Sequence, residues 1–207
     1  MKKVVWSAIA RVAIVAVTLT GVSCGELTRQ GQSASYVIVT ELVAASGAEP
    51  EEFGGTLFSD VITMVEVENV RVPTVFADLG RVTMQLALKD PGPPSSPNAP
   101  TANNFITINR YRVTFTRADG RNTPGVDVPF GFDGAVTFTV GAGAVTHSFE
   151  LVRHIAKQEA PLRALASSEV VIATIADVTF YGHDQTGREV SAQGRLLVQF
   201  GNFGDPQ

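Results

Sequence analysis

Cysteine and tryptophan are almost absent from this sequence, with Cys24 and Trp6 as the only ones among 207 residues. A single cysteine cannot form a disulfide within the chain. Charged residues are also scarce, at 17% against the ~25% usual for soluble domains. Hydrophobic residues make up 44% of the chain, which argues against disorder because disordered chains are poor in apolar residues and rich in charge. The length fits one all-β domain or two small ones.

Basic residues are too few and too scattered for a nucleic-acid binder. After residue 23 the only lysines are Lys89 and Lys157, and the arginines occur singly. The whole chain has a formal net charge of −4, and residues 1–23 hold three basic side chains and no acidic one. A nucleic-acid surface needs concentrated positive charge to neutralise phosphates. The composition therefore excludes nucleic acid as a partner.

No pattern of catalytic residues stands out. The three histidines, His147, His154 and His183, show none of the close spacing that zinc ligands have. No serine lies in a Gly-x-Ser-x-Gly elbow, and no phosphate-binding glycine loop is present. A pair of carboxylates for glycoside hydrolysis stays possible, but the candidates fit solvated positions better: Glu51, Glu52, Glu66 and Glu68. We expect no enzyme activity, no catalytic residue and no cofactor.

Calcium is the more serious metal candidate, because loop carboxylates and carbonyls suit a hard cation. Asp119, Asn122 and Asp127 fall in one expected loop region, and Asp133 and Asp184 in two others. They form no contiguous Asp-x-Asp-x-Asp run, and Asp-Gly is first of all a turn signal. We interpret all five as structural turn residues and predict no metal site.

The N-terminus has the pattern of an export signal. Positive charge from Lys2, Lys3 and Arg11 accompanies an apolar run of 11 residues at 12–22, too short for a membrane-spanning helix of roughly 20 residues. The run ends in Gly21-Val22-Ser23-Cys24-Gly25. This resembles the lipobox of bacterial lipoproteins, although Gly21 stands where leucine is usual.

The resemblance implies that residues 1–23 are a signal peptide and that Cys24 carries a lipid that holds the protein at a membrane. It also implies an extracytoplasmic protein of the cell envelope. If the cell is Gram-negative, the resemblance favours the outer over the inner membrane, since Gly25 is not the aspartate that retains lipoproteins at the inner membrane. The alternative is an ordinary secretory signal with Cys24 as an incidental thiol. Residues 24–34 are small and polar, which is typical of a flexible tether.

From Tyr36 onward the chain alternates apolar and polar residues with a period of two, the mark of half-buried strands. We expect strands near residues 36–44, 56–67, 70–76, 80–88, 105–117, 126–131, 135–140, 145–153, 168–181 and 188–200. Residues 157–167 are the one plausible helical segment. Short strands separated by Gly, Pro and Asp turns favour a sandwich over βαβ units. The pattern resembles immunoglobulin-like and fibronectin type III-like sandwiches in architecture alone, so no functional residue carries over.

The proline-rich segment 90–102 has five prolines in thirteen residues, so it is no central strand. It either links two domains or forms a loop within one. We expect one antiparallel β-sandwich domain over residues 35–205 with a loop at 90–102, because a domain ending before it would be too small for an independent core.

The C-terminal hairpin has the best-defined register. Its apolar residues share one parity on each side of a turn at 183–187, and we expect Phe180, Val190, Val198 and Phe200 to be buried. Within the turn we expect Asp184 and Gln185 to be exposed. Gly187 is expected to take positive φ.

Aromatic residues give weak support for sugar binding, which uses flat exposed rings. Trp6 leaves with the signal peptide, so the tyrosines Tyr36, Tyr111 and Tyr181 remain. Several phenylalanines fall instead at core positions: Phe115, Phe138, Phe149, Phe180 and Phe200. The sequence thus favours a lipid-anchored envelope lipoprotein with a binding or structural role, its partner an envelope protein or glycan. The alternative is an extracytoplasmic carbohydrate-binding module or a small hydrolase.

Overall fold

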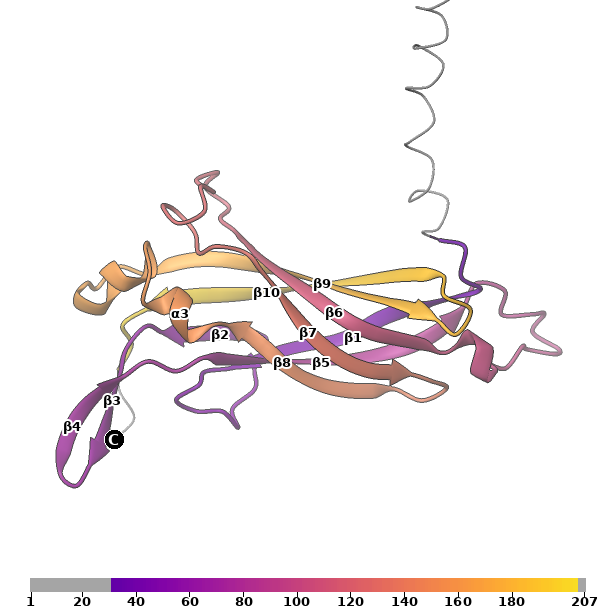
Figure 1. Cartoon of the computed structure of the whole chain (residues 1–207), viewed down its shortest axis with the longest axis horizontal. Coiled ribbons are helices and arrows are strands. Elements are labelled where there is room, and N and C mark those ends of the chain that lie inside the picture. The colour runs from indigo at the N-terminus through magenta and orange to yellow at the C-terminus, as the bar shows by residue number, and fades with distance from the viewer. Residues whose placement is uncertain (1–30, 205–207) are drawn as a thin grey trace, which may run out of the picture.

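A computed structural model describes residues 31–204 of the chain. The expected signal peptide, Cys24 and most of the expected tether lie outside the described residues. Two β-sheets pack face to face, which confirms the all-β sandwich (Figure 1). The smaller sheet has the order β1-β5-β8, and its strands are β1 (Ser35–Ala45), β5 (Asp78–Leu88) and β8 (Val145–Val152).

The larger sheet has the order β2-β10-β9-β6-β7. Its strands are β2 (Thr56–Asp60), β6 (Ile106–Thr116), β7 (Phe132–Val140), β9 (Ile172–Asp184) and β10 (Glu189–Gly201). A separate hairpin is formed by β3 (Thr63–Val67) and β4 (Val70–Thr74). The only helical elements among the described residues are η1 (Ala102–Asn104), α3 (His154–Lys157) and η2 (Leu162–Ser167). None of these is long and apolar enough to cross a membrane.

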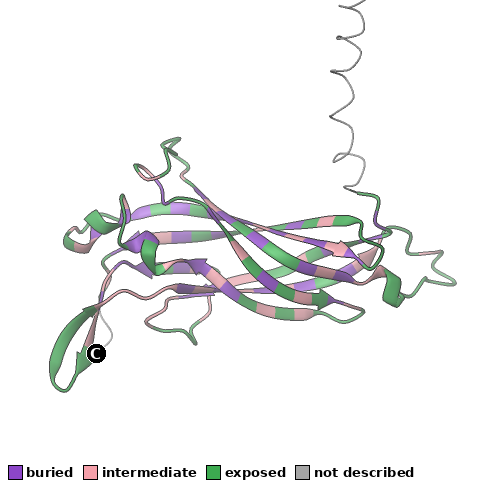
Figure 2. Cartoon of the chain, viewed as in Figure 1, coloured by how far each residue is buried: buried purple, intermediate pink, exposed green. Residues whose placement is uncertain are grey.

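The core forms because alternate side chains of each strand point between the sheets. In Figure 2 the buried and exposed colours alternate along the long strands. Phe149 of β8 meets Phe180 of β9 across the two layers, with ring centroids 5.3 Å apart and nearly perpendicular ring planes. Tyr111 joins them with its ring centroid 5.0 Å from that of Phe149. The predicted burial of Phe115, Phe149, Phe180, Val198 and Phe200 is confirmed, whereas Phe138 and Val190 are only half-buried.

The expected single strand over 56–67 is two strands, because the chain leaves the sandwich after β2. The carboxylate of Asp60 accepts hydrogen bonds from the backbone N–H of Ile62 and the hydroxyl of Thr63, which fixes the bend. β3 then pairs only with β4. β2 runs parallel to β10, so the sandwich is not wholly antiparallel as expected.

The strand expected at 126–131 is wrong. The chain from 117 to 131 forms a loop in which Pro124 and Val128 make one isolated bridge. Pro124 and Pro129 have no backbone donor, and Gly125 takes a positive φ of 76°. Val128 is buried all the same. Its apolar side chain therefore contributes to the core, but from a loop and not from a strand.

The two ends of the sandwich differ. One end, called here the tether end, carries Gly31, the proline-rich loop 89–101 and the β9–β10 turn, and the β3–β4 hairpin and α3 lie at the opposite end (Figure 1). Segments on both sides of the proline-rich loop are bonded together at the tether end: Lys89 N–H donates to the Ala34 carbonyl, and the Ser35 hydroxyl donates to the Asn104 carbonyl at 2.6 Å.

Candidate binding groove

A groove of about 990 Å³ lies at the tether end, between the start of β1 and the outer faces of β6, β9 and β10. Most of the residues that line it are polar. Its polar side chains are Ser33, Ser35, Tyr36, Lys89, Asn109, Arg110, Tyr181, His183, Glu189 and Ser191. Hydroxyl, amide, cationic and carboxylate groups thus lie around one concave surface, where polar groups can fix the orientation of a ligand.

A β-bulge in β6 shapes the groove. Ile108 pairs with Gly182 and Arg110 with Tyr181, so Asn109 is an extra residue with no partner on β9. The bulge turns two successive side chains, Asn109 and Arg110, to the outer face between the buried Ile108 and Tyr111. Bulges of this kind re-aim side chains and recur next to functional sites.

Gly182 is needed opposite this bulge. A Cβ at Gly182 would lie 2.2 Å from the carbonyl oxygen of Thr107, so only glycine lets β6 and β9 approach this closely.

Arg110 is held in place from two sides. Its guanidinium carbon lies 4.2 Å from the centre of the Tyr181 ring, and its Nη1 lies 3.4 Å from Asp133 Oδ1. Asp133 also binds Arg112, with Nη1 to Oδ2 at 2.9 Å. Asp133 was expected in a turn, but it lies inside β7, since the strand begins at Phe132. Both arginine side chains are about half exposed, so these ion pairs orient Arg110 more than they stabilise the fold.

Asp184 closes the β9–β10 turn and is buried, which contradicts its expected exposure. Its Oδ1 accepts hydrogen bonds from the hydroxyl and backbone N–H of Thr186 and the N–H of Arg188, at 2.6, 2.9 and 3.0 Å. Burial raises the pKa of Asp184, but these hydrogen bonds outweigh burial and hold the pKa below its ordinary value. Gly187 takes the predicted positive φ, at 80°.

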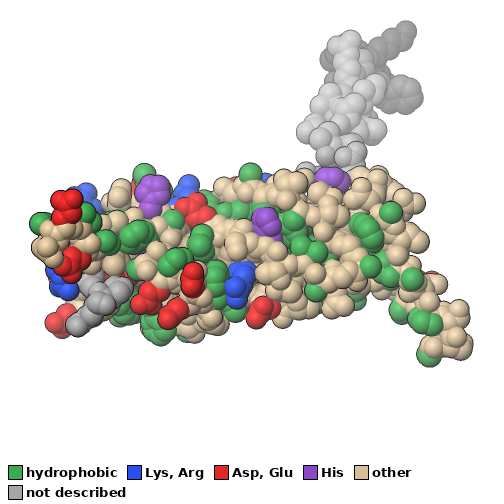
Figure 3. All heavy atoms as spheres, turned by 90° about the horizontal axis from the view of Figure 1, so that it is seen from below, with side chains coloured by type: hydrophobic (Ala, Val, Ile, Leu, Met, Phe, Trp, Pro, Cys, Tyr) green, Lys and Arg blue, Asp and Glu red, His purple; other side chains and the backbone are tan. Residues whose placement is uncertain are grey.

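The three histidines lie on three different elements and form separate patches on the surface (Figure 3). The His147 ring stacks on Phe138 with centroids 4.6 Å apart. His154 is exposed at the start of α3, and only His183 lines the groove. Among residues 31–204, no group of three His, Cys, Asp or Glu side chains is placed to hold a metal ion.

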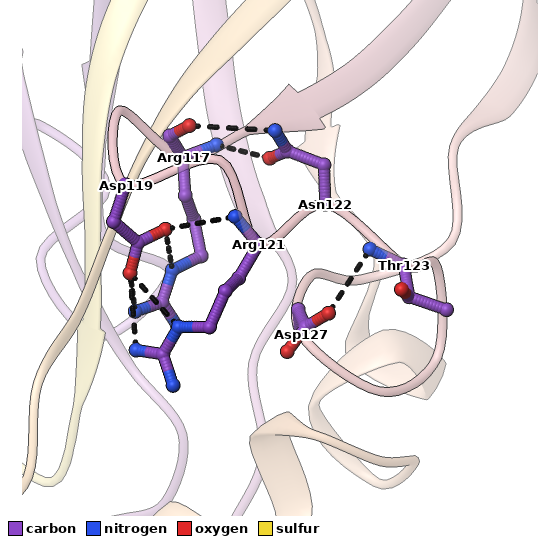
Figure 4. A network of polar contacts seen from close by, with 6 residues as sticks. All are labelled: Arg117, Asp119, Arg121, Asn122, Thr123 and Asp127. Atoms are coloured by element: carbon purple, nitrogen blue, oxygen red, sulfur yellow. Dashed lines mark hydrogen bonds and ion pairs between the residues drawn. The ribbon is translucent and has the colours of Figure 1, made fainter.

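The loop that holds three of the calcium candidates is organised by arginine instead (Figure 4). Asp119 Oδ2 lies 2.6 Å from Arg117 Nη2 and 3.0 Å from Arg121 Nη2. Hydrogen bonds from Arg117, more than those from Arg121, hold the pKa of Asp119 far below its ordinary value. Asn122 bonds the backbone of Arg117, and Asp127 accepts from the N–H of Thr123. These side chains serve as turn residues, as predicted.

The four glutamates considered for glycoside hydrolysis are exposed, as expected of solvated positions: Glu51, Glu52, Glu66 and Glu68. None of them lines the groove. Of the retained tyrosines, Tyr36 and Tyr181 line the groove, whereas Tyr111 is in the core.

Sequence reasoning missed the groove and its bulge. One signal was available: the polar pair Asn109-Arg110 interrupts the strict alternation of the strand between Ile108 and Tyr111. Two polar residues in succession inside a strand indicate an inserted residue.

Comparisons of the chain with models of protein families, with curated proteins and with solved structures found no match.

Proposed function

We propose that this chain is a lipid-anchored protein of the bacterial cell envelope that binds a glycan in the groove and catalyses no reaction. Cys24 carries the lipid and holds the sandwich outside the cytoplasm, at the outer membrane in a Gram-negative cell. The observation that carries the binding role is the groove itself. It gathers uncharged, cationic and acidic polar side chains, and those on β6, β9 and β10 are held in position by the sheet before a ligand arrives.

The place of the groove supports a ligand close to the membrane. Gly31 lines the groove, and residues 24–31 span about 25 Å at most when fully extended. A lipid on Cys24 therefore keeps the groove within a short distance of the bilayer. Glycans that project from envelope lipids occupy this zone.

The chemistry of the groove supports a hydroxyl-rich ligand. Asn109, Ser191 and Glu189 offer donors and acceptors for hydroxyl groups, and Tyr36 is 42% exposed at the rim, where its ring can pack on a sugar. Arg110 and Lys89 add positive charge that suits the acidic sugars or phosphates common in envelope glycans.

Binding of lipopolysaccharide tests the proposal. The mature chain with Cys24→Ser is titrated with deacylated lipopolysaccharide oligosaccharide in a calorimeter, and with peptidoglycan fragments in parallel. Arg110→Ala should weaken binding about tenfold, because a hydrogen bond to a charged group contributes about 1.5 kcal/mol.

Arg112→Ala is the matched control, because Arg112 binds the same Asp133 from the same strand but lies outside the groove. It should leave affinity unchanged. Equal loss in both variants would indicate unspecific attraction to arginine, and no binding to either glycan would contradict a glycan-binding role.

A further inference from the structure

Lys157 and Asp78 meet in the interior at the end of the sandwich opposite the tether. Lys157 Nζ lies 2.7 Å from Asp78 Oδ1, and the two side chains are 1% and 0% exposed. They are 79 residues apart in the sequence. Asp78 begins β5 and pairs with Val152 of β8, after which the short helix α3 brings Lys157 back over it.

Every polar atom of the pair is held by the fold. Asp78 Oδ2 accepts a hydrogen bond from the Ser59 hydroxyl at 2.6 Å, and Oδ1 accepts one from the Gly47 N–H at 3.0 Å. Lys157 Nζ also donates to the backbone carbonyl of Asp60 at 2.8 Å. The amine and the carboxyl group are therefore fixed in one orientation, in a site from which water is excluded.

An ion pair in such a site carries a large desolvation penalty, because both charges have lost their hydration. Burial favours the uncharged acid and raises the pKa of Asp78, although Lys157 and the hydrogen bonds oppose the shift. Transfer of one proton from Nζ to the carboxyl group within the pair would leave a neutral amine beside a neutral carboxylic acid. These are the two reactants of amide formation.

We propose that Lys157 and Asp78 condense into an amide bond within the folded chain. The lone pair of Nζ attacks Cγ of the protonated carboxyl group and the C–N bond forms. Nζ gives up a proton, the bond from Cγ to Oδ1 breaks, and Oδ1 leaves as one water molecule. An ammonium and a carboxylate become one neutral amide and one water, with no change of oxidation state.

The fold supplies what the reaction needs. Fixed reacting groups can have effective concentrations of about 10⁵ M or more, which offsets the stability of free acid and amine in water. The hydroxyl of Ser59 is aimed at Oδ2, where negative charge develops in the tetrahedral intermediate, as in an oxyanion hole. The Asp60 carbonyl accepts a hydrogen bond from Nζ and so holds the amine beside the carboxyl group of Asp78. The product neutralises both buried charges and ties β5 to α3.

Mass spectrometry tests the proposal without any variant. The intact mature protein, unfolded before measurement, should be lighter by one water molecule than its sequence requires. Trypsin should not cleave after Lys157, because the modified side chain has no ammonium group. The tryptic peptides 72–81 and 154–163 should appear joined. An intact mass equal to that of the sequence, with free peptides 72–81 and 154–157, would overturn the proposal.

Two variants test the chemistry. Lys157→Arg keeps the charge but should show the mass of its sequence. Ser59→Ala should slow formation of the joined peptide about 100-fold when formation is followed by mass spectrometry after a pulse of cell-free synthesis, as expected for loss of one oxyanion donor. A near-native circular dichroism spectrum would establish that the variant is folded. Formation at the wild-type rate in a folded Ser59→Ala protein would overturn the role given to Ser59. Neither result depends on the proposed glycan binding.

Discussion

The guanidinium group of Arg110 covers the ring of Tyr181, 4.2 Å away on the neighbouring strand. The two residues are register partners across β6 and β9, and the bulge at Asn109 brings them into the groove. Tyr181 therefore positions the cation that we assign to ligand binding.

This contact predicts graded effects on binding. Tyr181→Ala should weaken glycan affinity about threefold, because a cation–π contact at an exposed site contributes about 0.5–1 kcal/mol. Tyr181→Phe keeps the ring and should bind like the wild type. A double-mutant cycle with Arg110→Ala, measured by calorimetry, should show coupling between the two residues; additive losses would contradict the positioning role.

The aromatic core between the sheets predicts a large loss of stability. Phe180→Ala or Phe200→Ala should lower the free energy of unfolding by about 3–5 kcal/mol, since both side chains are fully buried and their truncation leaves a cavity. Phe58→Ala is the control, because Phe58 is 54% exposed on β2. Urea melts followed by circular dichroism measure the difference, and equal losses at Phe58 and Phe180 would be incompatible with this core.

The buried carboxylate of Asp184 predicts a dependence of stability on pH. Its folded pKa is lower than its ordinary value of 3.8, so its contribution is complete above about pH 5 and is lost as the pH falls below 3.8 toward the folded pKa. Asp184→Ala should cost about 1–2 kcal/mol at pH 7 and less at pH 3. Gln185 lies at an exposed turn position, so the free energy of unfolding of Gln185→Ala should stay within about 0.5 kcal/mol of wild type at both pH values. A pH-independent loss at Asp184 would contradict the assigned hydrogen bonds.

The exposure of the proline-rich segment predicts that a protease cuts the chain there without separating the two fragments. Residues 91–99 are mostly exposed, so limited proteolysis should cut there. The buried cluster includes residues on both sides, such as Val37, Val82 and Phe180, so the fragments should stay associated and unfold in a single thermal transition. Two independent calorimetric transitions would show two domains instead.

The sequence predicted the strands that alternate cleanly, because a period of two decides which face of a strand is buried. It failed where the contacts of a single side chain, and not the alternation of apolar and polar residues, decide the local structure. Asp60 bends the chain between β2 and β3, and Val128 is buried from a loop, neither of which leaves a periodic signal. Asp184 looked like an ordinary turn residue, since its burial depends on packing in the folded hairpin. Lys157 and Asp78 are far apart in the sequence, so only the fold brings them together.

Fatty-acid labelling tests most directly whether the sandwich is anchored at a membrane. Cells that express the full chain are grown with an alkyne-tagged fatty acid, and the protein is purified and stained for the tag. The wild type should be labelled and fractionate with membranes, whereas Cys24→Ser should be unlabelled and released from them. Equal labelling of both proteins, or none in the wild type, would contradict a lipid on Cys24.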